Sequence, residues 1–233
     1  MEGVRSDHTG IAARITLENA PDNRLYPAML EALVGALQDA DANPDVKAVV
    51  LTGAGAVFCG GVDGQRLAEG DPSAFATTLV KLFKLIPTLG VPVIAAVNGD
   101  ALMSGFSLVC AADIAIGVEG ARLGTIEASL GLWPTIAQVP VLHRLLPGHA
   151  LANILTGEPF SAQRAYEVGA LTKVVAADEL EPEVEHWLTL STRSKALVRG
   201  RQSAHRLLSL PYAQALDASF EEFTTLFATA RPA

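Results

Sequence analysis

The sequence KAVVLTGAGAVFCGG, residues 47–61, joins an apolar segment to a loop rich in glycine. Its first six residues predict a strand that is buried on both faces, as strands of parallel sheets are. The same order returns at residues 92–105. There PVIAAV predicts a second buried strand, Asn98 and Gly99 predict a turn, and a short apolar helix is expected to begin near Ser104. Two such units favour a mainly parallel sheet covered by helices.

The segments around these two units alternate between strand and helix patterns. In the strand expected at residues 11–17, we predict that Ile11, Ile15 and Leu17 share one face. The other expected elements are a helix from Pro27 to Asn43, an amphipathic helix at 73–86, a strand at 114–117, and a mostly helical region from Ser161 that is interrupted by a strand at 171–175. This alternation predicts an α/β protein, and no proline- or serine-rich linker divides it.

The composition narrows the range of partners. The 233 residues carry a net charge of −8, which argues against a nucleic-acid binder because phosphate binding needs a basic field. Cys59 and Cys110 are far apart, so neither a zinc cluster nor a disulfide framework is expected, and the five histidines lack metal-ligand spacing. The first residues contain no apolar signal core, and polar side chains interrupt the apolar residues 101–118. We therefore expect a soluble, cytoplasmic protein without a metal, nucleic-acid or membrane partner.

Glycine motifs for nucleotides do not match in detail. Gly53 and Gly55 follow a strand, but Phe58 stands where a dinucleotide-binding loop has its third glycine. No Gly-Lys-Ser/Thr sequence is present, and the residues around Ser107 do not complete a nucleophile elbow. No permanently bound cofactor is therefore expected.

Two loops remain, at residues 59–63 and 101–105, and each follows a buried strand. Parallel strands deliver such loops to one edge of a sheet, where ligands usually bind. One backbone N–H group from each loop could converge on a single oxygen and form an oxyanion hole, with the second donor at a helix N-terminus. The local sequence equally allows two tight turns whose glycines serve packing, so both interpretations stay open at this point.

Four stretches, in order, resemble the crotonase superfamily, the enoyl-CoA hydratase/isomerase family. They are VLTGAGAVFCGGVD at 50–63; AAVNGDAL at 95–102 with CAADI at 110–114; LGTIE at 123–127 with LGLWP at 130–134; and LTGEPFSA at 155–162 with Ala165 and Gly169. The resemblance covers the chain from about Ile11 to Leu208. It implies a spiral of ββα units in residues 1–185, a helical segment at 186–233 that builds trimers and is not an independent domain, and an acyl-CoA thioester as substrate.

The resemblance also implies roles for single residues. The backbone N–H groups of Val62 and Ser104 correspond to the two oxyanion donors, which bind the thioester oxygen as an enolate forms. The substrate-binding residues that it implies are Cys59, Gly61, Asp63 and Ser107, for which burial, loop capping or core packing is the alternative.

The acid–base positions depart from the pattern of the family's hydratases. Those enzymes use two glutamates; Glu127 matches the second, whereas Ser107 stands at the first and cannot act as a carboxylate base. A single carboxylate beside an oxyanion hole suits transfer of a proton between two carbons, so we favour double-bond isomerisation with Glu127 as acid and base. A solvated carboxylate at a helix start is the alternative for Glu127. Hydration, another lyase or hydrolase reaction of the family, and non-catalytic acyl-CoA binding are the alternative functions.

The C-terminal region is locally basic. No Asp or Glu occurs between His186 and Leu216, and this suits the phosphates of coenzyme A, although a solvated helix face is the alternative. The candidates for phosphate binding are Arg199, Arg201, His205 and Arg206. Coenzyme A enters here as part of the substrate. By the same resemblance, a homotrimer or hexamer is expected.

Overall fold

The larger of two sheets forms the centre of the molecule. The computed structural model describes residues 2–194 and 196–229, except for the side chains of 197–199 and 227–229. In spatial order the strands of this sheet are β1 (Val4–Thr9), β2 (Ala12–Leu17), β3 (Ala48–Gly53), β5 (Val93–Val97), β7 (Ile114–Val118) and β10 (Lys173–Val175). β1 and β2 form an antiparallel hairpin, and every later pair is parallel. All residues of β3 and β5 are buried, as expected for central strands with both faces covered.

A smaller sheet supports the loops that follow the central strands. Its strands, in spatial order, are β4 (Val57–Cys59), β6 (Asp100–Leu102), β8 (Arg122–Gly124) and β9 (Phe160–Ser161). β4 follows β3, β6 follows β5, and β8 follows β7, so each short strand extends one long strand into the second sheet. This repeated unit confirms the expected spiral of the crotonase fold.

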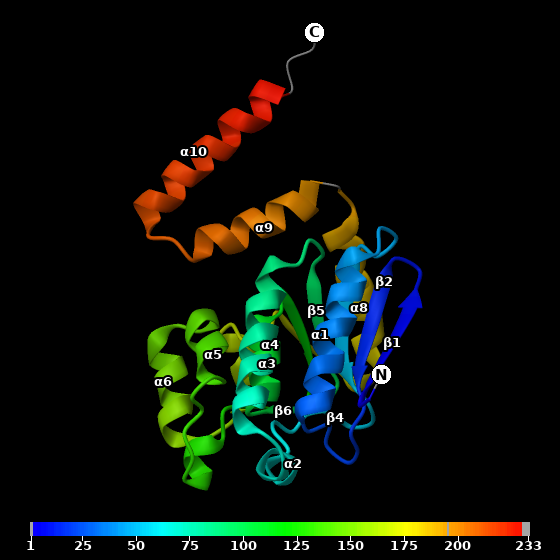
Figure 1. The fold of residues 1–233 in the computed structure, drawn as a ribbon, viewed down its shortest axis with the longest axis vertical. Helices are drawn as coiled ribbons and strands as arrows, with labels where there is room; N and C mark the ends of the chain where they lie inside the picture. The colour runs from blue at the N-terminus through cyan, green and yellow to red at the C-terminus, as the bar shows by residue number, and fades with distance from the viewer. Residues whose placement is uncertain (1, 195, 230–233) are drawn as a thin grey trace.

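Helices cover the sheets (Figure 1). They are α1 (Pro27–Ala42), α2 (Gly64–Glu69), α3 (Pro72–Leu85), α4 (Ser104–Ala111), α5 (Gln138–Arg144), α6 (Pro147–Thr156), α7 (Ala162–Glu167) and α8 (Leu180–Thr192), with short 3₁₀ turns η1 (Ile86–Thr88), η2 (Glu127–Leu130) and η3 (Ala177–Glu179). α1 packs on α3, and α8 packs against β3, β5 and β7. The limit expected at residues 185 and 186 therefore falls inside α8, whose buried Val184 and Leu188 belong to the core.

The last two helices lie at one end of the core. α9 (Ala196–Leu208) crosses the end of the larger sheet and α10 (Tyr212–Thr229) turns back outward (Figure 1). Tyr212, Leu216 and Phe220 follow one another at four-residue spacing, and all three are exposed in the single chain. Across residues 2–194 and 196–229, no helix combines the length and apolar character needed to cross a bilayer.

The main strands and helices agree with the sequence-based expectations, but one side-chain placement was wrong. Ile11 lies in the turn between β1 and β2 and is exposed, whereas Ile15 and Leu17 are fully buried. The hairpin turn at Gly10 and Ile11 ends the pairing before Ile11 can join the strand. The strand β1 and the four short strands of the second sheet were not expected.

Candidate functional site

The first loop of the site presents the backbone of Val62. Leu25 donates to the carbonyl of Gly61 (2.8 Å), and Asp63 donates to the carbonyl of Leu25 (2.9 Å). In a parallel bridge of this kind, the residue between those two bonds directs its own N–H to the opposite side. Within the described residues, no acceptor binds the N–H of Val62. This donor therefore remains available to a ligand.

The second loop presents Ser104 through an unusual backbone turn. Met103 has φ 54° and ψ −127°, a left-handed conformation that costs a non-glycine residue about 1–3 kcal/mol. Its N–H is held by the carbonyl of Gly124 at 2.9 Å. The turn makes Ser104 the first residue of α4, where a backbone N–H has no partner inside the helix. No acceptor in the described part of the chain binds this N–H either.

Glycines allow the two loops to lie against each other. Gly61 has φ 102°, and a Cβ at this position would lie 2.6 Å from Cβ of Met103. A Cβ at Gly105 would lie 2.3 Å from the carbonyl oxygen of Cys59. Contacts this close leave room only for glycine, so both residues are needed where the loops meet. The structure therefore brings the two loops that carry the predicted donors Val62 and Ser104 into contact.

Glu127 stands at the start of η2, just beyond β8. Because Gly124 binds the N–H of Met103, the end of β8 lies directly beside the second loop. Glu127 is only 5% exposed, and its Oε2 has no hydrogen-bond partner among the described residues. Burial raises the pKa of this carboxyl, and the backbone N–H groups of Glu127 and Ile126 offset only part of that effect. Glu127 is thus a buried carboxyl with one unused oxygen, and the alternative of a solvated helix-start residue is wrong.

The raised pKa of Glu127 predicts a pH-dependent stability. The unfolded chain loses this proton near the ordinary pKa of 4.5, whereas the folded chain keeps it to a higher pH, so the group destabilises the fold progressively above pH 4.5. We expect Glu127→Gln to raise the free energy of unfolding by about 1 kcal/mol at pH 8, and to have no effect at pH 4. Urea unfolding at both pH values measures this. An equal effect of the substitution at both values would contradict the assigned pKa direction.

Ser107 lies in α4, fully buried, with its hydroxyl turned into the protein. Its Oγ donates to the carbonyl of Ala137 at 2.6 Å, and the carbonyl of Met103 lies 3.3 Å away. This bond ties α4 to the segment that leads into α5. The Ser107 hydroxyl is therefore taken up by an internal hydrogen bond, and core packing describes this residue better than substrate contact.

Two other candidates of the first loop have structural partners. Cys59 is completely buried in β4, and burial raises the pKa of its thiol to about 12. Burial does the same for Cys110 in α4. Asp63 caps α2 by accepting a hydrogen bond from the N–H of Arg66 (3.1 Å). These contacts support the alternatives of burial for Cys59 and loop capping for Asp63.

The basic candidates of the C-terminal region fall into three groups. Arg201 is only 7% exposed and binds Asp113 (2.7 Å) and the carbonyl of Ile86 (2.8 Å), while His205 binds the other oxygen of Asp113 (2.7 Å). Burial alone would raise the pKa of Asp113, but the His205 hydrogen bond and the Arg201 charge hold it below its usual value. These bonds argue against both residues as phosphate ligands, because their donors fix α9 to the core.

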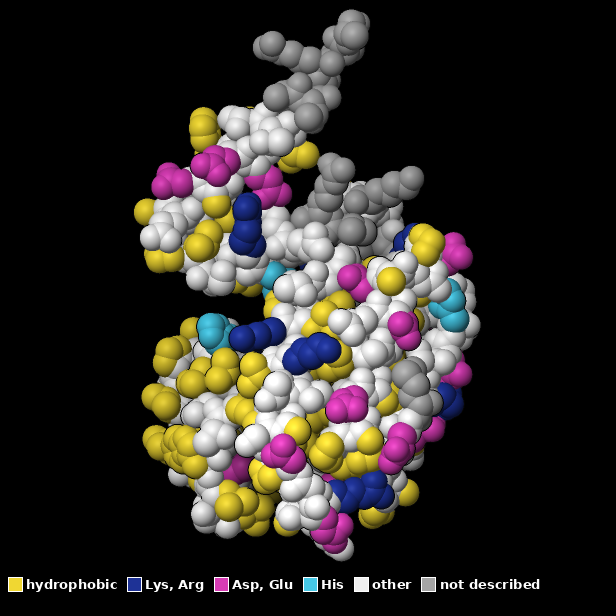
Figure 2. Space-filling view, in the orientation of Figure 1, with side chains coloured by type: hydrophobic (Ala, Val, Ile, Leu, Met, Phe, Trp, Pro, Cys, Tyr) yellow, Lys and Arg dark blue, Asp and Glu magenta, His cyan; other side chains and the backbone are white. Residues whose placement is uncertain are grey.

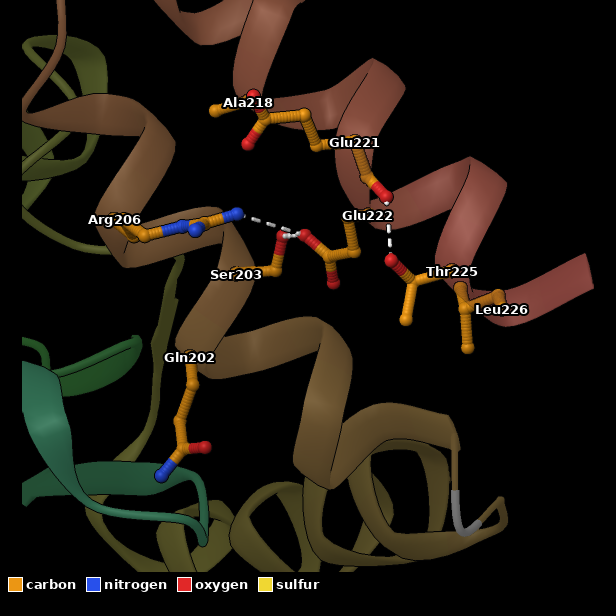
Figure 3. Close-up of a pocket in the computed structure, with 8 residues that line it drawn as sticks. All are labelled: Gln202, Ser203, Arg206, Ala218, Glu221, Glu222, Thr225 and Leu226. Atoms are coloured by element: carbon orange, nitrogen blue, oxygen red, sulfur yellow. Dashed lines mark hydrogen bonds and ion pairs between the residues drawn. The ribbon is translucent and has the colours of Figure 1, made fainter. Parts of the chain in front are cut away.

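Arg206 and Arg199 remain. Arg206 shares the oxygen of Glu222 with Ser203 (3.1 and 2.6 Å), at the side of an open cavity between α9 and α10 (Figure 3). Arg206 is exposed and stays a candidate for phosphate binding, while the side chain of Arg199 lies outside the described residues.

Two cations beside the first loop were not among the candidates. Arg24 precedes Leu25, the residue paired with Val62, and Arg66 lies with its guanidinium carbon 4.1 Å from the ring centroid of Tyr26. Both are about half exposed and each pairs with a neighbouring aspartate. Arg24 lies near the loop because Leu25 pairs with Val62, 37 residues later, and Arg66 lies near Tyr26 for the same reason. A local pattern of charges could not predict this position. No cluster of His, Cys, Asp or Glu able to hold a metal occurs among the described residues.

Known proteins resemble this chain in both sequence and fold. A family model described as enoyl-CoA hydratase/isomerase matches residues 7–231. The chain is 36% identical over 184 residues to the zebrafish mitochondrial enoyl-CoA hydratase domain-containing protein 3, covering 76% of this chain and 63% of that protein. It is also 36% identical over 217 residues to the zebrafish peroxisomal bifunctional enzyme, covering 91% of this chain and 29% of that protein. The match thus spans less than two thirds of either relative.

A solved structure extends the similarity to the whole chain. The enoyl-CoA hydratase of Mycobacterium smegmatis superposes with a TM-score of 0.91 at 26% identity, covering all of this chain and 93% of that one. The family model, the relatives and the shared fold lead to the same conclusion: the chain belongs to the enoyl-CoA hydratase/isomerase family.

Proposed function

We propose that this protein moves a double bond in a 3-enoyl-CoA thioester, with Glu127 as its single acid–base group. The Glu127 carboxylate takes a proton from C2, and the electrons shift toward the thioester oxygen to form a dienolate. The backbone N–H groups of Val62 and Ser104 stabilise the negative charge on that oxygen. Protonated Glu127 then returns the proton at C4, which gives the conjugated 2-enoyl thioester.

Burial suits Glu127 to both halves of this reaction. A carboxyl with a raised pKa is a stronger base than a solvated one, and it is also able to hold the proton until C4 is in reach. Its Oε2 carries no competing hydrogen bond from the described residues. A C–H group forms only a weak hydrogen bond and cannot displace a stronger partner from the base. A carboxylate oxygen that has no other partner can therefore approach it directly.

The observation that carries the choice of isomerisation is the hydrogen bond from Ser107 to Ala137. Hydration needs a group that activates water opposite the proton donor, and in the family's hydratases the first glutamate has this role. Here the hydroxyl at that position is buried and already donates to a carbonyl. This arrangement supports a proton shuttle and leaves water addition without its base.

The direct test is to mix the purified protein with an unconjugated 3-enoyl-CoA and to follow the ultraviolet absorbance of the conjugated product. A parallel reaction with a 2-enoyl-CoA measures hydration as a loss of the same absorbance. We expect isomerisation to exceed hydration. Faster hydration would replace this proposal with a hydratase, and acyl-CoA binding without either reaction would replace it with a binding role.

We also propose that copies of this chain assemble into a trimer or hexamer through the apolar side of α10. The exposed side chains at four-residue spacing on this helix support an interface, because a continuous apolar stripe is rarely left in water. A second group of exposed apolar residues lies over α5 and α6 (Figure 2), including Leu142, Leu146 and Leu155. Sedimentation equilibrium distinguishes both assemblies from a monomer.

A further inference from the structure

Asn153, in α6, is a buried amide whose hydrogen bonds all reach the chain around Glu127 or the end of its own helix. Its Oδ1 accepts from the N–H (2.9 Å) and the hydroxyl (2.8 Å) of Thr125, and its Nδ2 donates to the carbonyl of Thr125 (3.2 Å) and of Glu158 (2.7 Å). The Asn153 side chain thus binds both the N–H and the carbonyl of Thr125, the two groups that a neighbouring strand would bind. Thr125 lies two residues before Glu127.

The end of α6 also contacts the other side of Glu127. Gly157 ends this helix with φ 68°, and a Cβ there would lie 2.4 Å from the N atom of Ser129 and 3.1 Å from the carbonyl oxygen of Ile126. The turn of η2 is therefore packed directly on the backbone of Gly157. Asn153 and Gly157 together fix the residues before and after the catalytic carboxyl.

Glu127 depends on this support because its own side chain has little else to orient it. Oε2 lacks a partner among the described residues, and the groups that stabilise the carboxylate are N–H groups of its own turn, at Ile126 and Glu127. The direction of the carboxyl therefore follows the position of the turn. A shift of about 1 Å in a reacting group can cost about 100-fold in rate.

We propose that Asn153 is a positioning residue that fixes the 125–129 turn and so aims the Glu127 carboxyl at the substrate carbons. This inference rests on the proposed role of Glu127 as acid and base. Asn153 lies far from both oxyanion loops in the sequence. Its role is therefore in proton transfer and not in binding of the thioester.

The test compares Asn153→Leu, which keeps the side-chain size and removes all four hydrogen bonds, with Thr125→Val, which removes only the hydroxyl bond. For N153L we expect kcat to fall by roughly 10- to 100-fold with KM changed by less than about twofold. Water gains access to a loosened carboxyl, so the acid limb of the pH–rate profile moves to lower pH. T125V is expected to show the same changes to a smaller degree.

Leu188→Ala in α8 is the matched control, because it removes buried side-chain volume from a helix outside the contacts of Asn153 and Gly157 and is expected to lower the melting temperature. It is expected to leave kcat and the pH profile unchanged. If N153L and L188A have the same kcat and the same pH–rate profile, the proposal is wrong. If N153L does not fold, T125V decides the question by the same comparison.

An infrared titration separates this inference from the proposed reaction. The carboxyl band of Glu127 is obtained as the difference between each protein and its Glu127→Gln version, and it requires no turnover. A lower pKa of that band in N153L, in a protein that does not isomerise 3-enoyl-CoA, would support the positioning role and reject the reaction. An unchanged band together with unchanged kinetics would reject the positioning role alone.

Discussion

Glu127→Gln is expected to lower kcat for isomerisation by roughly 10²- to 10⁴-fold, the range that a general acid–base group contributes. The amide has nearly the same size and can neither accept the C2 proton nor return it at C4. Both proposed oxyanion donors are backbone groups on other loops, so the dissociation constant for an acyl-CoA is expected to stay within about twofold. Stopped-flow absorbance measures the rate, and isothermal titration with an unreactive acyl-CoA measures binding.

Glu119→Gln, at an exposed position after β7, is the control for a change of one carboxylate in net charge. It should leave both constants unaltered. Retention of full turnover by E127Q would show that another group transfers the proton, and the assignment would then be wrong. A parallel loss of binding would instead mean that the carboxyl holds the ground-state substrate.

Gly61→Ala is expected to cost roughly 10²- to 10³-fold in kcat, as removal of one oxyanion donor does. The backbone at Gly61 has φ 102°, which an L side chain rarely adopts, and the new Cβ would meet the Met103 side chain at 2.6 Å. Relief of this contact must separate the two loops or rotate the peptide that carries the Val62 N–H. Either movement weakens the bond to the developing negative charge more than it weakens ground-state binding.

Gly64→Ala, at the residue that follows this loop, provides a control. Gly64 begins α2, has no positive φ, and a Cβ there would meet no atom within 4 Å. We expect G64A to behave as the unchanged protein. If G61A folds with its usual melting temperature and turns over at the usual rate, the Val62 N–H does not take part in catalysis.

The long elements of the fold could be predicted because their side-chain patterns are local. The buried strands β3 and β5 are runs of apolar residues, and α1 starts at Pro27 and ends before Asn43 and Pro44. The second sheet could not be predicted in this way. β4, β6 and β8 have three residues each, too few for a periodicity, and they exist because each continues a strand of the larger sheet.

The same distinction applies to the site. Family motifs placed the loops of Val62 and Ser104 and the segment of Glu127, and the structure brings those loops and that segment together. Arg201 shows where local sequence misleads: a basic residue in a basic segment suggests phosphate binding, but the fold buries it against Asp113, 88 positions away. Nothing in the sequence indicated a role for Asn153, because three of its four hydrogen bonds join it to Thr125, which lies 28 residues earlier.

Because both cysteines are buried, the rates at which they react with an alkylating reagent measure local opening of the fold. Burial raises the pKa of both thiols to about 12, so the reactive thiolate is almost absent at pH 7, and both cysteines are buried in the closed fold. Alkylation of Cys59 therefore reports transient separation of β4 from its neighbours, and alkylation of Cys110 reports release of α4. Since these elements carry the two loops that we propose to form the oxyanion hole, the two labelling rates compare the free energies with which the two loops are held in place.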